Sequence, residues 1–289
     1  FSIKSAKFTN VLSSIFLMAL TSQSCSNDYL DVEPTQSISA EDLSLYNNNA
    51  GAEGFVTTIY AKFLDWNVSS FSWIGITSIA SDEADKGSSP GDTGGDKNLL
   101  DALNFTPTGG SIEEIFKANY QIVNRCNQAL YFIPQLNNAD QALRDRLIGE
   151  AKFLRAFSYF TLVRTYGGVP IVDHVPIPGN EDDRVMQLTR KTKEEVYAFI
   201  EKDLKDAITA LPDKSAYTGV NVGRASKGAA YALLAKVSLY QKKWQQVVDN
   251  CNLVTGYSLT PDFQEIYKVT GENNAESIFE IQGKGGASQ

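Results

Sequence analysis

Residues 149–160 carry the sequence GEAKFLRAFSYF, which lies within a helical pattern running from about Asp140 to Tyr166. Apolar residues recur there every three or four positions, so they share one face of a helix. Gly167 and Gly168 stop the pattern, and Pro170 prevents a restart because proline lacks an amide donor. The face expected to be buried comprises Leu143, Leu147, Ala151, Leu154, Phe157 and Leu162.

The charged residues of this helix suggest a structural role. Glu150, Lys152 and Arg155 fit a solvated or interhelical set of charges. We also expect Arg155 and Arg164 to pair with buried carboxylates, which the sequence does not identify.

Two further helices are predicted, and each begins with a capping box. Residues 111–133 begin with a capping box formed by Ser111 and Glu114, and their apolar stripe ends before Pro134. Residues 192–211 begin with a second capping box, formed by Thr192 and Glu195, and Pro212 follows them. Helices bounded in this way are typical of a mainly α protein.

A helical hairpin is predicted after them. Residues 226–241 are rich in alanine, and a further helix begins near Trp244 and continues past Cys251. Only Lys242 and Lys243 separate the two, which indicates an antiparallel pair. Small residues on one helix facing large ones on the next indicate tetratricopeptide-like repeats, although the strict repeat consensus is absent.

The remaining segments are less regular. Residues 39–66 predict a first helix with Ser39 as its N-cap, and residues 67–110 have the composition of a long loop. Residues 169–177 suggest an extended segment, and the alternating residues 276–282 suggest a strand. Because little chain follows to pair with that strand, we expect the sequence to stop before a C-terminal part.

The N-terminus has the layout of a bacterial lipoprotein signal. Lys4 and Lys7 precede a short apolar run, and Cys25 follows small and polar residues. We therefore predict a signal peptide over residues 1–24, lipid attachment at Cys25, and a polar tether over residues 25–38. The alternative is a cleaved signal with a cysteine nearby by chance.

Composition narrows the function classes. The formal net charge is −8, and an acidic protein repels nucleic-acid phosphates, so no nucleic-acid partner is expected. With Cys25 lipidated, Cys126 and Cys251 fit two separately buried thiols better than a disulfide. His174 is the single histidine, which excludes a His-based zinc cluster. It fits an ordinary loop position better than a catalytic triad, and no metal or cofactor is expected.

A ligand site is predicted in the segment 67–110. A sugar needs an aromatic plate and planar hydrogen-bonding groups, so we expect Trp73 to stack on it. Asp82 and Asp85 would accept bonds from its hydroxyls, with Asn98 close by. The alternative places Trp73 in the core and the aspartates on a solvated loop. Carboxylates between Asp82 and Asp96 could also bind calcium, but they lack EF-hand spacing.

Three blocks of sequence resemble the SusD/RagB family. The first joins GEAKFLRAFSYF to residues 162–172 (LVRTYGGVPIV), and the second is YQIVNRCN at residues 120–127. The third is Cys25 followed by DYLD at residues 28–31 and by Pro34. The resemblance covers essentially the whole chain but only the N-terminal part of the family architecture. It implies a SusD-like α/α superhelix with long loops over residues 39–289, incomplete at its C-terminus.

The resemblance also implies a function. Members are outer-membrane lipoproteins of Bacteroidetes-type bacteria that capture oligosaccharides or other nutrients at the cell surface. They pass them to a SusC-type TonB-dependent transporter. Binding without catalysis is therefore the favoured interpretation. The alternatives are a glycoside hydrolase with two carboxylates and a scaffold of stacked helix pairs that binds other proteins.

Overall fold

The structure is a computed structural model that describes residues 40–283 except positions 88, 90, 92 and 93, with side chains from residue 43. The chain divides into two compact units, Phe1–Ser44 and Leu45–Gln289. Helix α2 (Ala40–Leu45) begins in the first unit. All other elements belong to the second unit. The lipid-attachment prediction at Cys25, the signal peptide and the tether lie outside the described residues.

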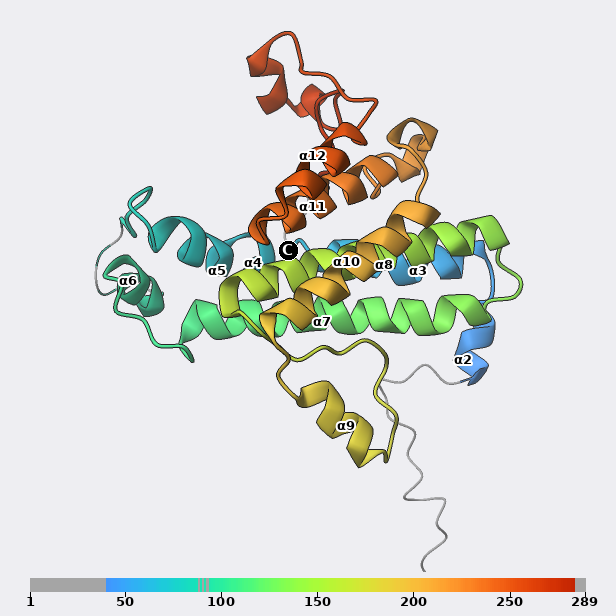
Figure 1. Ribbon diagram of the computed structural model, residues 1–289, viewed down its shortest axis with the longest axis horizontal. Coiled ribbons are helices and arrows are strands. Elements are labelled where there is room, and N and C mark those ends of the chain that lie inside the picture. The colour runs from blue at the N-terminus through green and yellow to red at the C-terminus, as the bar shows by residue number, and fades with distance from the viewer. Residues whose placement is uncertain (1–39, 88, 90, 92–93, 284–289) are drawn as a thin grey trace, which may run out of the picture. The chain divides into compact units, whose positions relative to one another are not determined.

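Long helices form the centre of the second unit. Helix α8 (Gln141–Tyr166) packs between α7 (Gly110–Phe132) and α10 (Lys193–Ala210), and the three run side by side (Figure 1). Helix α3 (Asn49–Lys62) packs against both α7 and α8. The side chains of α8 from Phe153 to Val163 are almost all buried, so this helix is the core of the fold.

The predicted hairpin follows and is confirmed. Helix α11 (Lys227–Tyr240) packs against α10 on one side and against α12 (Trp244–Asn252) on the other. Ser226 caps α11 by accepting a hydrogen bond from the amide of Ala229 at 3.2 Å. Consecutive antiparallel helices therefore stack on their neighbours, and the predicted mainly α, tetratricopeptide-like superhelix is confirmed.

Short elements join the long helices. They are α4 (Trp66–Ser69), α5 (Phe71–Ile74), the π-helix η2 (Gly75–Ile79), α6 (Gly95–Asp101), α9 (Glu181–Leu188), and the 3₁₀ turns η3 (Ile133–Gln135), η4 (Lys214–Ala216), η5 (Gly219–Asn221), η6 (Phe263–Tyr267) and η7 (Val269–Gly271).

The prediction of one helix over residues 39–66 is wrong. The chain leaves the helical conformation after Leu45, and Asn48 starts α3 by accepting a hydrogen bond from the amide of Gly51 at 2.9 Å. An asparagine at this position competes with the helical backbone and favours a cap. The predicted long loop over 67–110 is also wrong in part, because α4, α5, η2 and α6 lie within it.

Of the two predicted capping boxes, one is confirmed. Thr192 accepts a hydrogen bond from the amide of Glu195, whose carboxylate accepts one from the amide of Thr192 at 2.7 Å. The box at the start of α7 is wrong. Asp96 of α6 accepts hydrogen bonds from the amide and hydroxyl of Ser111, and Glu114 accepts one from Ser72. Tertiary contacts thus replace the local ones that the spacing predicted.

The predicted strand over 276–282 is wrong, because the described residues contain no strand there. Phe279 instead packs against Phe153 of α8, with ring centroids 5.0 Å apart. The predicted extended segment 169–177 is confirmed in its conformation; it has one isolated bridge, from Pro170 to Arg190.

The predicted pairing of Arg155 with a buried carboxylate is confirmed, because Arg155 forms a double hydrogen bond with the buried Asp203 of α10. Glu150 is more deeply buried than predicted and lies beside two arginines. Lys152 does form the expected interhelical pair, with Asp206. Arg164 has no carboxylate partner among the described residues, so its predicted pairing is wrong.

The cysteine and histidine predictions are partly confirmed. Both Cys126 and Cys251 are free, but only Cys126 is buried, and burial raises the pKa of its thiol. His174 is a loop residue whose ring lies within hydrogen-bond distance of Asp173 and Asp183. The hydrogen bond that its ring donates to Asp173 raises the pKa of His174. This histidine therefore fastens the loop to α9. Over the described residues, every helix is too short or too polar to span a lipid bilayer.

Candidate functional site

A pocket of about 1060 Å³ lies on the helical body. It lies among η2, the start of α7, the end of α8 and the segment that follows α8. Aromatic and aliphatic side chains dominate its walls, which are formed by Trp73, Ile76, Thr77, Ala80, Leu100, Phe105, Pro107, Thr108, Ile112, Glu113, Phe116, Arg164, Thr165, Tyr166, Gly168, Val169, Pro170 and Arg190.

Two glycines shape one side of this pocket. Gly167 ends α8 with φ of 73°, a left-handed conformation that favours glycine. At Gly168 an added Cβ would lie 2.1 Å from the carbonyl oxygen of Lys191, so a side chain does not fit there. The chain can therefore fold back beside residues 190–191, and Arg190 reaches the end of α8.

The aromatic rings at the pocket are held by one another and by the backbone. Phe116 meets the ring of Tyr166 edge to face, with centroids 5.2 Å apart, and packs on Tyr120 at 4.7 Å. The hydroxyl of Tyr166 donates to the carbonyl oxygen of Ile112 at 2.5 Å. Trp73 comes from α5 and is partly exposed. Such fixed rings can pack against the flat C–H face of a ring-shaped ligand.

A buried polar cluster supports the pocket from behind. Lys97 of α6 contacts Asp96 at 3.0 Å and Ser111 at the start of α7, and its ammonium group lies 3.6 Å from the ring centroid of Phe71. Burial raises the pKa of Asp96, but the hydrogen bonds from Ser111 and Lys97 outweigh this and keep it below its ordinary value. The cluster fixes α6 against α7 and so holds Leu100 in the wall.

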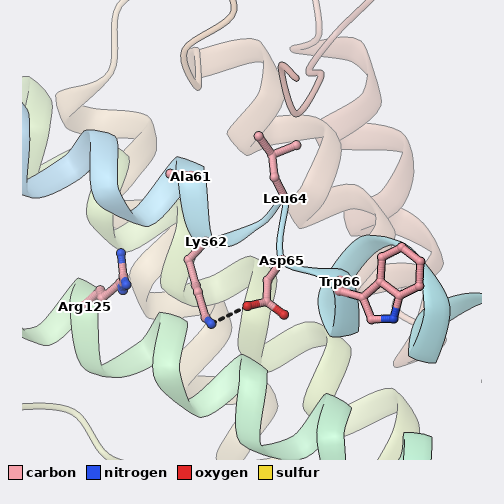
Figure 2. A pocket seen from close by; sticks show the side chains of 6 residues that line it. All are labelled: Ala61, Lys62, Leu64, Asp65, Trp66 and Arg125. Carbon is pink, nitrogen blue, oxygen red and sulfur yellow. Dashed lines mark hydrogen bonds and ion pairs between the residues drawn. The ribbon is translucent and has the colours of Figure 1, made fainter. Parts of the chain in front are cut away.

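A smaller hollow of about 460 Å³ lies beside Trp66 (Figure 2). Asp65 caps α4 by accepting from the amide of Asn67 at 3.0 Å, and it pairs with Lys62 at 2.5 Å. Burial raises the pKa of Asp65, but the bonds from Lys62 and Asn67 bring it below its ordinary value. Trp66 is 63% exposed and stacks on Phe71, with centroids 5.4 Å apart. The remaining lining residues are Ala61, Leu64 and Arg125.

The predicted site residues do not gather at one place. Trp73 lines the large pocket. Asp82 and Asp85 are exposed in the segment after η2 and line neither hollow, and Asn98 on α6 lines neither. The structure therefore places the predicted aromatic plate at a pocket but leaves its predicted hydrogen-bonding partners outside. Within the described residues, no three His, Cys, Asp or Glu side chains form a group suited to a metal ion.

Sequence reasoning missed most of the pocket. Phe116 and Tyr166 fall within predicted helices but had no predicted role, and Arg190 follows a helix that no pattern predicted. The usable signal was the pair Gly167 and Gly168, which marks a sharp turn after a long helix. A turn of this kind brings the helix end and the following segment together, which is where the pocket lies.

Comparison with known proteins identifies the relatives of this chain. A family model for SusD-like proteins, described as starch-binding and associating with the outer membrane, matches residues 28–239. A SusD-like protein of Bacteroides ovatus is 25% identical over 287 aligned residues, covering 91% of this chain and 48% of the relative.

Solved structures agree. A SusD-like protein of Bacteroides fragilis superposes with a TM-score of 0.70 at 27% identity, covering 84% of this chain and 46% of the other. A laminarin-binding SusD-like protein superposes with a TM-score of 0.68 at 28% identity, covering 80% of this chain and 50% of the other. The chain thus spans about half the length of these relatives.

Proposed function

This chain belongs to the SusD-like family of starch-binding proteins that associate with the outer membrane, and from that premise we propose that it captures a glycan without cleaving it. The observation that carries the proposal is Trp73 on the wall of a pocket of about 1060 Å³. Sugars bind aromatic rings through their C–H faces, and this pocket offers Trp73, Phe105, Phe116 and Tyr166. The laminarin-binding relative supports a glycan as ligand.

The distribution of carboxylates favours binding over hydrolysis. A glycosidase of the usual kind needs two carboxyl groups on either side of the scissile bond. Among the described residues, Glu113 is the one carboxylate on the wall of the large pocket, and it pairs with Lys117 at 2.5 Å. At the small hollow, Asp65 is the one carboxylate among the described lining residues, and it caps α4. Incubation with candidate glycans should therefore give retention and no product.

Replacing Trp73 with alanine is expected to weaken glycan affinity by about tenfold or more, because stacking on an aromatic ring contributes roughly 1–3 kcal/mol in comparable sites. The measurement is calorimetric titration with a panel of oligosaccharides that includes laminari-oligosaccharides. Trp73→Phe retains a ring and should keep most of the affinity.

The matched control is Trp244→Ala. Trp244 is 60% exposed on α12 and lines neither hollow, so its loss should leave affinity unchanged. If wild type binds a glycan and Trp73→Ala binds it equally well, the ligand does not stack on Trp73.

We further propose that the protein is held at the outer membrane, facing the cell surface, by a lipid on Cys25. There it would deliver the glycan to a SusC-type TonB-dependent transporter. The lipoprotein-like layout of residues 1–25 and the description of the family support this assignment. A barrel receptor encoded beside this gene would support the partner, and neighbouring hydrolases would indicate the sugar.

Changing Cys25 to serine is expected to move the protein from the membrane fraction to the soluble fraction, because serine has no thiol to receive a diacylglyceryl group. Fractionation of cells that make either form checks this, with mass spectrometry of the native N-terminal peptide. Cys251→Ser is the control, since Cys251 is exposed and free on α12. An unmodified thiol at Cys25 in the native protein would rule out the anchor.

A further inference from the structure

Two arginines at the large pocket have no acidic partner. Arg164 and Arg190 both line it, and neither pairs with a carboxylate among the described residues. The chain carries a formal net charge of −8, so acidic groups are abundant. Of the other six arginines, four pair with carboxylates, whereas two have only neutral hydrogen-bond partners; the four are Arg146, Arg155, Arg184 and Arg224, and the two are Arg125 and Arg144. Two unpaired guanidinium groups at one pocket of an acidic protein therefore call for a chemical explanation.

Both guanidinium groups are held in place through part of their donors. Arg190 donates from Nε to the carbonyl oxygen of Gly168 at 2.6 Å and from Nη2 to that of Tyr166 at 2.9 Å. Arg164 donates from Nε to the carbonyl oxygen of Phe160 at 3.2 Å, and its Cζ lies 4.4 Å from the Phe160 ring centroid and 5.6 Å from that of Tyr240 on α11. Nη1 of Arg190 and both terminal nitrogens of Arg164 make no protein hydrogen bond among the described residues.

We propose that this pocket takes an anionic sugar, whose oxyanion group is bound by Arg164 and Arg190 while its ring packs on the aromatic wall. This proposal rests on the proposed glycan-binding function and names the class of glycan. Guanidinium groups present parallel N–H donors that match the oxygens of a carboxylate or sulfate, and such bonds are stronger than neutral ones. Glu113 does not neutralise them, because it pairs with Lys117 on α7.

The apolar walls strengthen this preference. Charged hydrogen bonds gain strength where side chains limit the access of water, and the partly buried rings of Trp73 and Phe116 line this pocket. A neutral sugar offers these guanidinium donors only hydroxyl oxygens, which accept weaker hydrogen bonds than an oxyanion. An oxyanion on the sugar satisfies them, so binding should discriminate by charge and not only by ring shape.

The test compares an acidic sugar with its neutral methyl ester and adds a sulfated sugar. The protein is titrated with oligogalacturonate, with the same oligosaccharide as its neutral methyl ester, and with a sulfated galactan oligosaccharide. We expect at least one anionic sugar to bind about tenfold or more tightly than the methyl ester. That preference should weaken as NaCl is raised, because salt screens charged contacts. The carboxylated and sulfated sugars show which oxyanion the arginines prefer.

Variants assign the effect to the two arginines. Arg164→Gln and Arg190→Gln should each remove most of the preference for the anionic sugar, whereas Arg164→Lys should keep part of it. Arg184→Gln is the matched control, because it removes the same charge from the exposed surface of α9. Thermal melts monitor folding. If a variant unfolds, the wild-type affinities for the acid and its methyl ester still decide whether binding discriminates by charge.

The possible outcomes distinguish failure of this inference from failure of the proposed glycan-binding function. Equal affinity for the acid, the sulfated sugar and the ester overturns the inference and leaves glycan binding intact. A preference for an anionic sugar that survives in folded Arg164→Gln and Arg190→Gln overturns it too. Failure to bind any charged or neutral glycan overturns the proposed function itself.

Discussion

Replacing Asp203 with alanine is expected to lower the free energy of unfolding by about 3–5 kcal/mol, because it leaves the buried charge of Arg155 without a partner. Arg155 on α8 donates to both carboxylate oxygens of Asp203 on α10, at 2.7 and 2.8 Å. It also donates to Asn127 of α7 at 2.7 Å and to the carbonyl oxygen of Asp173 at 2.8 Å. One guanidinium group thus joins three helices and the extended segment 169–177.

The electrostatics of Arg155 support this estimate. Burial alone would lower the pKa of its guanidinium group, but the hydrogen bonds and charge of Asp203 outweigh that and raise it. The charged form is therefore stabilised mainly by Asp203. Without that carboxylate, Arg155 remains among buried groups with only neutral acceptors.

Urea unfolding followed by circular dichroism measures the effect. The double variant Arg155→Met/Asp203→Leu should be far less destabilised than Asp203→Ala, because no buried charge is left unpaired. Glu265→Ala breaks a surface pair with Lys268 and should change stability by no more than about 0.5 kcal/mol. A change of that small size in Asp203→Ala would contradict the assignment.

Replacing Glu150 with alanine is expected to lower the free energy of unfolding by about 2–4 kcal/mol, somewhat less than the loss at Asp203. Glu150 is fully buried and accepts hydrogen bonds from Tyr60 and Arg224, each at 2.9 Å. Arg146 lies 3.1 Å from it and also contacts Glu53 at 3.1 Å. The loss is smaller because Arg146 keeps this second carboxylate.

Glu150 links helices distant in sequence. Tyr60 belongs to α3, and its hydroxyl also accepts from the amide of Ala225, just before α11. Burial raises the pKa of Glu150, and the charges of Arg224 and Arg146 limit that rise. Removal of the carboxylate should therefore loosen both α3 and the segment just before α11.

Hydrogen exchange read by mass spectrometry locates this effect. In Glu150→Ala, protection should fall in α3 and around Ala225 more than in α12. Glu150→Gln keeps the side-chain shape and one acceptor oxygen, so it should be less destabilised than the alanine variant. Unfolding at the wild-type denaturant concentration in Glu150→Ala would show that this buried carboxylate contributes nothing.

The long helices followed from local chemistry alone. Helix α8 ends at Tyr166 because Gly167 and Gly168 follow it, and α10 begins at Thr192 because its side chain caps the first turn. Apolar spacing identified the buried faces of α7 and α8, and the short break at Lys242 and Lys243 predicted the antiparallel pair α11 and α12. Each of these signals depends on residues a few positions apart.

Contacts between distant segments explain what the sequence predicted wrongly. Ser111 and Glu114 have the spacing of a capping box, yet Asp96 and Ser72 provide closer partners from other elements. Residues 276–282 alternate like a strand, but their Phe279 packs on the helices, and no strand is described beside it. In both cases a partner distant in the chain is energetically better than the local one.

The pocket also depends on contacts between distant segments. Spacing and composition could propose Trp73 as an aromatic plate, but Asp82 and Asp85 lie elsewhere, while Arg164 and Arg190 line the same pocket as Trp73. Helical periodicity specifies which face of a helix is apolar, because it depends on neighbouring residues. A pocket depends on which segments meet after the chain has folded, and the packing of helices and connecting segments sets that arrangement.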